Sequence, residues 1–105
     1  MAVADVRVVP VGGSDSCMRS VVARAYRAAQ KSGLRHELTP TATVLEGEVA
    51  AILDTARRMH EAALAGGVER VVTTLTLDER RDAPVSMGRM VASVMEEIAR
   101  ELSPA

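Results

Sequence analysis

Glu46 is the acidic residue best placed to bind a ligand, because it stands between Leu45 and Gly47, where an expected strand gives way to a helix. Thr39 and Thr43 precede it in the same segment. A carboxylate and hydroxyls at strand ends could exchange hydrogen bonds with an amino group of a small molecule. Glu46 could instead complement the positive N-terminal end of the following helix, an effect of about 0.3 to 1 kcal/mol. The residues alone leave both interpretations open.

A second candidate is the loop Gly12-Gly13-Ser14-Asp15-Ser16, which lies between an expected strand and an expected helix. Its backbone amides could hold an anion at the start of the helix. The spacing fits neither the dinucleotide-binding nor the phosphate-loop pattern well. We therefore favour the interpretation that the glycines turn the chain while Ser14 or Ser16 caps the helix.

The remaining reactive side chains suggest no catalytic or metal site. Cys17 is the single cysteine, which excludes an internal disulfide and leaves a soft metal without its second thiolate ligand. His36 and His60 lie far apart, with no ligand spacing around them. No nucleophile stands beside a base at a recognisable spacing. We expect no enzymatic activity, no metal and no cofactor.

All five residues from Asp78 to Asp82 are charged, and both signs are present. Such a loop is usually a solvated turn with internal ion pairs of small individual value. It could also lock an interface or form the rim of a binding site, and the sequence does not choose between these roles.

Alternating and helical apolar patterns predict the elements that position these residues. Period-two patterning and short apolar runs indicate strands at 2–11, 34–38, 42–45 and 68–78, whereas helical spacing indicates helices at 16–31, 48–65 and 86–102. The order βαββαβ is that of the ferredoxin-like α+β sandwich, in which two helices cover one face of an antiparallel sheet. The chain length suits a single domain over 1–105, with the last helix as an addition.

The last helix carries an unbroken apolar stripe from Met87 to Leu102. Because two helices already cover the core face of the sheet, this stripe must be buried against another surface. The strand at 68–78 lies at an edge of the sheet, where unpaired backbone groups can form hydrogen bonds with a strand of another chain. We therefore expect a homo-oligomer, either a dimer or a tetramer.

Composition narrows the partners and the compartment. Net charge is −1, and 13 basic residues are interleaved with 14 acidic ones, which argues against duplex nucleic acid and anionic membranes. Tyr26 is the single aromatic residue, so stacking of RNA bases on the strands is excluded. No apolar run approaches the roughly 20 residues of a membrane span, and no cationic leader is present. We expect a cytoplasmic protein.

Three segments carry a family resemblance, namely Val-Val-Pro-Val-Gly near the start, 32–47 in the middle and 70–82 toward the end. Together they resemble the small thiamine-binding-protein family. The resemblance spans nearly the whole chain and implies a ferredoxin-like fold and homo-oligomers, and it does not imply catalysis. It also implies that thiamine or its hydroxymethylpyrimidine part is the ligand.

The resemblance also assigns individual residues. Thr39, Thr43 and Glu46 match the family's central motif, and Ser14 and Ser16 represent its serine-rich loop. The basic and charged positions toward the end correspond to Arg70, Asp78, Arg80 or Arg81, and Asp82. We therefore expect a pocket lined by Thr39, Thr43 and Glu46, with Ser14 or Ser16 at its mouth.

Two other functions remain open at this stage. An amino-acid-sensing regulatory domain has the same topology and would bind its ligand between subunits, away from Glu46. A structural interaction protein would use its last helix to hold a partner and would bind no small molecule.

Overall fold

The computed structural model describes residues 1–12 and 15–102, with side chains omitted for 15–17. The elements follow the order expected for a ferredoxin-like α+β fold with an added C-terminal helix, which confirms that prediction. They are β1 (Ala2–Pro10), α1 (Asp15–Lys31), β2 (Arg35–Leu38), β3 (Thr43–Gly47), α2 (Val49–Leu64), β4 (Val71–Glu79) and α3 (Met87–Leu102).

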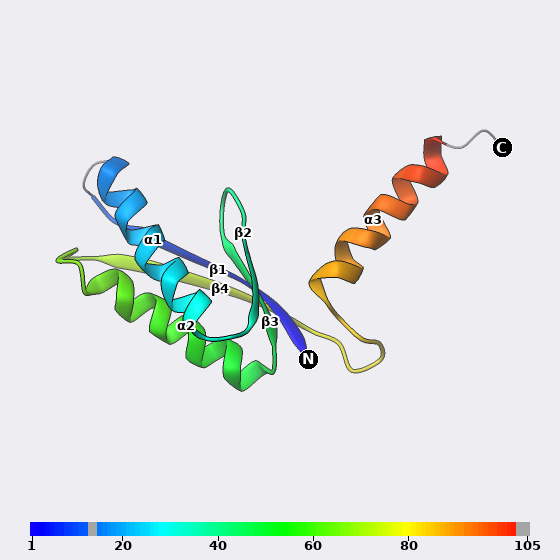
Figure 1. Ribbon diagram of the computed structural model, residues 1–105, viewed down its shortest axis with the longest axis horizontal. Coiled ribbons are helices and arrows are strands. Elements are labelled where there is room, and N and C mark those ends of the chain that lie inside the picture. Colours follow the sequence, from blue (N-terminus) through cyan, green and yellow to red (C-terminus); the bar gives the residue numbers. More distant parts are fainter. Residues whose placement is uncertain (13–14, 103–105) are drawn as a thin grey trace.

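The four strands form one antiparallel sheet in the order β2-β3-β1-β4. Helices α1 and α2 lie side by side on one face of this sheet, and α3 extends away from it (Figure 1). We call the other face, which carries Val3, Asp5, Arg7 and Glu46, the open face. The central position of β1 explains why its inward side chains are buried along nearly their whole length.

The core between the sheet and the two helices contains no aromatic residue. Its largest fully buried side chains are Leu45, Ile52, Met59, Val6 and Val21. Alanines at Ala25 and Ala29 of α1 and at Ala56 and Ala63 of α2 let the helices approach the sheet and each other closely. Burial of these apolar side chains is the main source of stability, at about 25 cal/mol per Å² removed from water.

Two strand boundaries differ by more than one residue from those predicted by the sequence. β3 continues past Leu45 to Gly47, because β1 offers it partners as far as Ala2. β4 begins at Val71 instead of Val68, because β1 ends its ladder with β4 at Pro10. The extent of each strand is therefore set by its neighbour as well as by its own pattern.

The buried stripe of α2 consists of Ile52, Thr55, Ala56, Met59 and Ala63. Leu53 and Leu64 are apolar residues of the same helix, but they are exposed because they flank this stripe. The packing of the helix on the sheet decides which of its leucines are buried. The number of apolar residues in the helix does not specify this packing.

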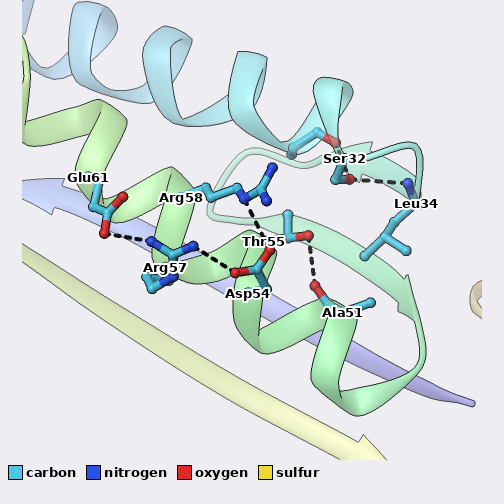
Figure 2. Close-up of polar contacts among 9 residues, drawn as sticks. Ser32, Leu34, Ala51, Asp54, Thr55, Arg57, Arg58 and Glu61 are labelled. Carbon is cyan, nitrogen blue, oxygen red and sulfur yellow. Dashed lines mark hydrogen bonds and ion pairs between the residues drawn. The ribbon is translucent and has the colours of Figure 1, made fainter.

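The solvent face of α2 carries ion pairs one turn apart (Figure 2). The guanidinium of Arg57 donates hydrogen bonds of 2.7 Å to Asp54 and 2.8 Å to Glu61, and Arg58 lies 3.0 Å from Asp54. The hydrogen bond from Arg57 lowers the pKa of the Asp54 carboxyl below its ordinary value. Such exposed pairs support the helix by only a few tenths of a kcal/mol each.

Two polar contacts fasten α2 to its neighbours. Arg24 of α1 donates a 3.2 Å hydrogen bond to the carbonyl of Ala63, near the end of α2. A 2.6 Å hydrogen bond joins His60 Nδ1 to the Thr73 hydroxyl of β4. At the other end of α1, the Ser32 hydroxyl accepts a hydrogen bond from the Leu34 amide (Figure 2).

Helix α3 is attached to the domain by its first turn. Met87 and Val85 pack with Val3 and Val44 on the open face. Beyond this turn the apolar residues of α3 are exposed, namely Met90, Val91, Val94, Met95, Ile98 and Leu102. The radius of gyration, 16.1 Å, exceeds the roughly 13 Å of a compact domain of this length because α3 projects outward. None of the helices described is long and apolar enough to cross a membrane.

Candidate functional site

A pocket of about 270 Å³ lies where β3 separates from β1. The ladder between these strands ends at the pair Val6 and Thr43, whereas β1 continues to Pro10 with β4 as its partner. The β2–β3 hairpin turns away at this point (Figure 1). The hairpin, the exposed edge of β1 and helix α1 therefore surround a gap in the sheet.

The walls of the pocket are mostly aliphatic. Apolar side chains lining it include Val6, Val22, Ala25, Leu38, Met18 and Met59, and its rim is the hairpin segment 39–43. Arg7, Val8 and Val9 of β1 close the remaining side. Ligand sites of small molecules usually occupy about 300 to 1,000 Å³ and are lined in this way. The pocket is thus the size of a single substituted ring.

Thr39 and Thr43 both line this pocket, and their hydroxyls have different surroundings. The Thr39 hydroxyl donates to the Ala42 carbonyl at 2.9 Å and accepts from the Ala42 amide at 3.1 Å. It therefore holds the hairpin turn in shape. Thr43 points inward beside Val6 and makes no side-chain hydrogen bond with the described residues, so its hydroxyl can contact a ligand.

Glu46 lies on the opposite side of the sheet from this pocket. Side chains alternate between the two faces of a strand, so Thr43 and Glu46, three positions apart, must point in opposite directions. Glu46 pairs in register with Val3 and reaches the open face, where it is 8% exposed. The expectation that Thr39, Thr43 and Glu46 line one pocket is therefore wrong.

The Glu46 carboxylate instead holds the start of α3. Its Oε1 atom accepts a 2.9 Å hydrogen bond from the Met87 amide, and its Oε2 atom lies 3.9 Å from Arg35 Nη1. A negative charge at the N-terminus of a helix is stabilised by the helix dipole. The sequence predicted this kind of interaction for Glu46, but with the helix that directly follows it. In the structure the helix is α3, which is distant in sequence.

The serine loop can be placed only in part. Ser14 lies outside the described residues. Ser16 belongs to the first turn of α1, and its side chain and that of Cys17 are also outside the description. The pocket contains Met18 from the next part of this helix. The role of Ser14 and Ser16 at the mouth of the pocket stays a prediction.

The other candidate residues make contacts within the protein. His36 Nδ1 lies 2.8 Å from the Leu34 carbonyl, and its ring meets the edge of Tyr26. Arg80 donates two hydrogen bonds to Asp82, at 2.9 Å and 2.7 Å, which lower the pKa of that carboxyl. The charged loop thus contains the internal ion pair of a solvated turn. Among the residues described, no cluster of three His, Cys, Asp or Glu side chains could hold a metal ion.

Sequence reasoning missed the edge of β1 as part of the site. The signal was available in Pro10, since proline within a strand indicates a position without a neighbouring strand on its nitrogen side. It also missed Met18, Val22 and Leu38, whose apolar character suggested core packing and not a pocket wall.

Comparisons with known proteins agree with this architecture. The family model of thiamine-binding proteins matches residues 4–95. A UPF0045 protein of Methanothermobacter thermautotrophicus is 37% identical over 99 residues, which cover 93% of this chain and all of the relative. A UPF0045 protein of Bacillus subtilis is 31% identical over 104 residues, covering 93% of this chain and 98% of the relative.

Solved structures show the same fold. The crystal structure of a hypothetical protein of Methanocaldococcus jannaschii has a TM-score of 0.83 and 33% identity, covering 90% of this chain and 96% of that one. A Thermotoga maritima protein assigned provisionally to thiamine biosynthesis or salvage has a TM-score of 0.77 and 22% identity, covering 89% and 97%. The match over residues 4–95, together with these relatives, shows that the chain belongs to the thiamine-binding protein family.

Proposed function

We propose that this protein binds thiamine, or the hydroxymethylpyrimidine part of thiamine, in the pocket between the β2–β3 hairpin, β1 and α1. Family membership supports the class of ligand. The observation that carries the proposal is the pocket itself, because the motif residues Thr39 and Thr43 form its rim and wall. A substituted pyrimidine ring has the size and the largely apolar faces that the pocket accepts.

Aliphatic and thioether side chains would contact the ring faces. Met18 and Met59 line the pocket together with Val22, and methionine adapts its shape to an aromatic neighbour with a gain of about 0.3 to 1.5 kcal/mol. Tyr26 of α1 contacts His36 of β2 and does not line this pocket. Directional hydrogen bonds must therefore supply most of the specificity.

We further propose that binding occurs without chemical conversion. Arg7 is the one ionisable residue among the described residues that line the pocket. A general base or a nucleophile at the ligand would need a histidine, a carboxylate, a lysine or a cysteine within hydrogen-bond reach. The composition of the lining supports a binding role.

A matched pair of substitutions tests the binding site. Thr43→Val removes the hydroxyl in the pocket and keeps the side-chain shape, so we expect the affinity for hydroxymethylpyrimidine to fall about tenfold. Thr55→Val makes the same change at a buried position of α2, where the hydroxyl donates to the Ala51 carbonyl, and should leave affinity unchanged. Isothermal titration calorimetry measures both. Unaltered protein that binds neither thiamine nor the pyrimidine would refute the proposal.

We also propose that the protein is a homo-oligomer. The exposed stripe on α3 and the outer edge of β4 are the surfaces that need a partner. A second copy of the chain carries the same stripe and the same strand edge, so it can pair with both surfaces. The open face of that copy also presents Val9 and Val72 as apolar contacts. Unpaired strand edges and contiguous apolar surface of this kind are features of protein interfaces.

A further inference from the structure

The edge of β1 that faces the pocket carries backbone groups without a neighbouring strand. β3 pairs with β1 from Ala2 to Val6, and β4 pairs with it from Ala2 to Pro10. Beyond Val6, the side of β1 that faces away from β4 therefore pairs with none of the strands described. The pocket lies against this stretch, since Arg7, Val8 and Val9 line it.

The register decides which of these residues points its N–H and C=O groups into the pocket. The amide of Val11 donates to the Arg70 carbonyl at 3.0 Å, so Val11 faces β4. Backbone groups of successive strand residues point alternately to the two sides, and the register from Val8 to Pro10 is continuous. Val9 and Arg7 therefore also face β4. The N–H and C=O of Val8 face the pocket, and they make no backbone hydrogen bond with the described residues there.

Pro10 supports this assignment independently. Pro10 lies two positions after Val8, so its backbone nitrogen and carbonyl face the same side of β1 as those of Val8. Proline has no N–H to donate. A proline inside a strand is accommodated where its nitrogen faces no partner strand. Its presence in β1 thus agrees with an open side at both Val8 and Pro10.

We infer that the backbone of Val8 recognises the amino-substituted edge of the pyrimidine, its N–H donating to the ring nitrogen and its C=O accepting from the neighbouring amino group. This inference rests on the proposed function and deepens it. In an antiparallel pair, one residue exchanges both an N–H···O and a C=O···H–N bond with the residue opposite. The pyrimidine edge presents a similar acceptor and donor side by side, so the ring completes the ladder that β3 leaves unfinished.

The shape of the pocket favours a ring over an extended peptide. A peptide strand would need several successive residues with free donors and acceptors. Pro10 supplies no donor, and the hairpin turn held by Thr39 closes the other end next to Thr43. The carbonyl of Pro10 lies beyond the residues described as lining the pocket, so on this side of β1 the pocket meets one backbone donor and one backbone acceptor, both of Val8. This pair matches one edge of a heterocycle.

The experiment combines two variants with two ligand analogues. Val8→Pro removes the N–H of this residue and leaves the ladder hydrogen bonds between β1 and β4 intact. Val8→Ala keeps the N–H and shortens the side chain more than the proline substitution does. One analogue replaces the ring nitrogen beside the amino group by C–H, and the other replaces the far ring nitrogen. Circular dichroism confirms the fold of each variant, and calorimetry gives the affinities.

In the unaltered protein and in Val8→Ala, we expect loss of the near nitrogen to weaken binding about tenfold and loss of the far nitrogen to have little effect. Val8→Pro should bind the parent pyrimidine about tenfold more weakly and no longer distinguish it from the near-nitrogen analogue. If Val8→Pro does not fold, the affinities of the two analogues for the unaltered protein and for Val8→Ala still test the inference. Equal binding of the parent and the near-nitrogen analogue by the unaltered protein would overturn the inference alone. Failure of the unaltered protein to bind any pyrimidine would overturn the proposed function as well.

Discussion

The backbone amide of Met87 donates a 2.9 Å hydrogen bond to the carboxylate of Glu46, which joins the open face of the sheet to the first turn of α3. The acceptor is buried, and the donor belongs to a residue that packs with Val3 and Val44. Because the rest of α3 contacts little of the domain, this bond and its apolar surroundings set the direction in which the helix leaves the sheet.

Replacement of Glu46 should therefore affect stability more than ligand binding. In Glu46→Ala the buried Met87 amide loses its acceptor, which should lower the free energy of unfolding by about 1 to 3 kcal/mol. Glu46→Gln keeps an acceptor oxygen and should cost less. Urea unfolding measures both, with Glu48→Ala as the exposed control. A Glu46→Gln protein with normal stability but no pyrimidine binding would place Glu46 at the ligand instead.

The apolar stripe of α3 should be the contact between copies. Charges at two of its exposed valines, in the double variant Val91→Asp and Val94→Asp, cannot be buried in an apolar interface without a large cost. We expect light scattering to show an oligomer for the unaltered protein and a smaller species for this variant. Ser93→Asp, a change at a neighbouring exposed position, should keep the oligomer. A monomeric unaltered protein at micromolar concentration with helical α3 would contradict the expectation.

The ion pair of the charged loop should be visible by pH titration. Hydrogen bonds from Arg80 lower the pKa of Asp82, so the folded protein holds this carboxylate ionised to a lower pH than the unfolded chain does. The small stabilisation from the pair is present above the unfolded pKa and is lost as pH falls through the folded one. In NMR titrations, Arg80→Gln should return the Asp82 midpoint toward the ordinary value, whereas Arg81→Gln should leave it unchanged. Equal midpoints in both variants would contradict the assigned cause.

Gly66 and Arg24 should be energetically coupled. A Cβ atom at Gly66 would clash with the guanidinium group of Arg24, so Gly66→Ala must displace that side chain from the Ala63 carbonyl. We expect the substitution to lower the free energy of unfolding by about 1 kcal/mol. The loss should be smaller when Arg24 is already methionine. Thermal unfolding of the two single variants and the double variant gives the coupling, and additive effects would argue against this contact.

The sequence by itself determined the order and the type of the elements. The apolar alternation from Ala4 to Val8 and the helical spacing from Val49 to Ala63 are local properties of the sequence, which do not depend on how the elements pack. The turn that forms the rim of the pocket was also predictable, because Pro40 lacks an N–H for a ladder hydrogen bond and cannot lie in a central strand. The resemblance of these segments to known proteins added the family.

The tertiary structure decided which of these residues meet. Thr43 and Glu46 are close in sequence but belong to opposite faces of β3, so one enters the pocket while the other holds a helix that begins 41 positions later. The free donor and acceptor of Val8 exist because β1 is longer than its ladder with β3. Strand ends and strand neighbours depend on pairing across the sheet, and no pattern within a single segment records that pairing.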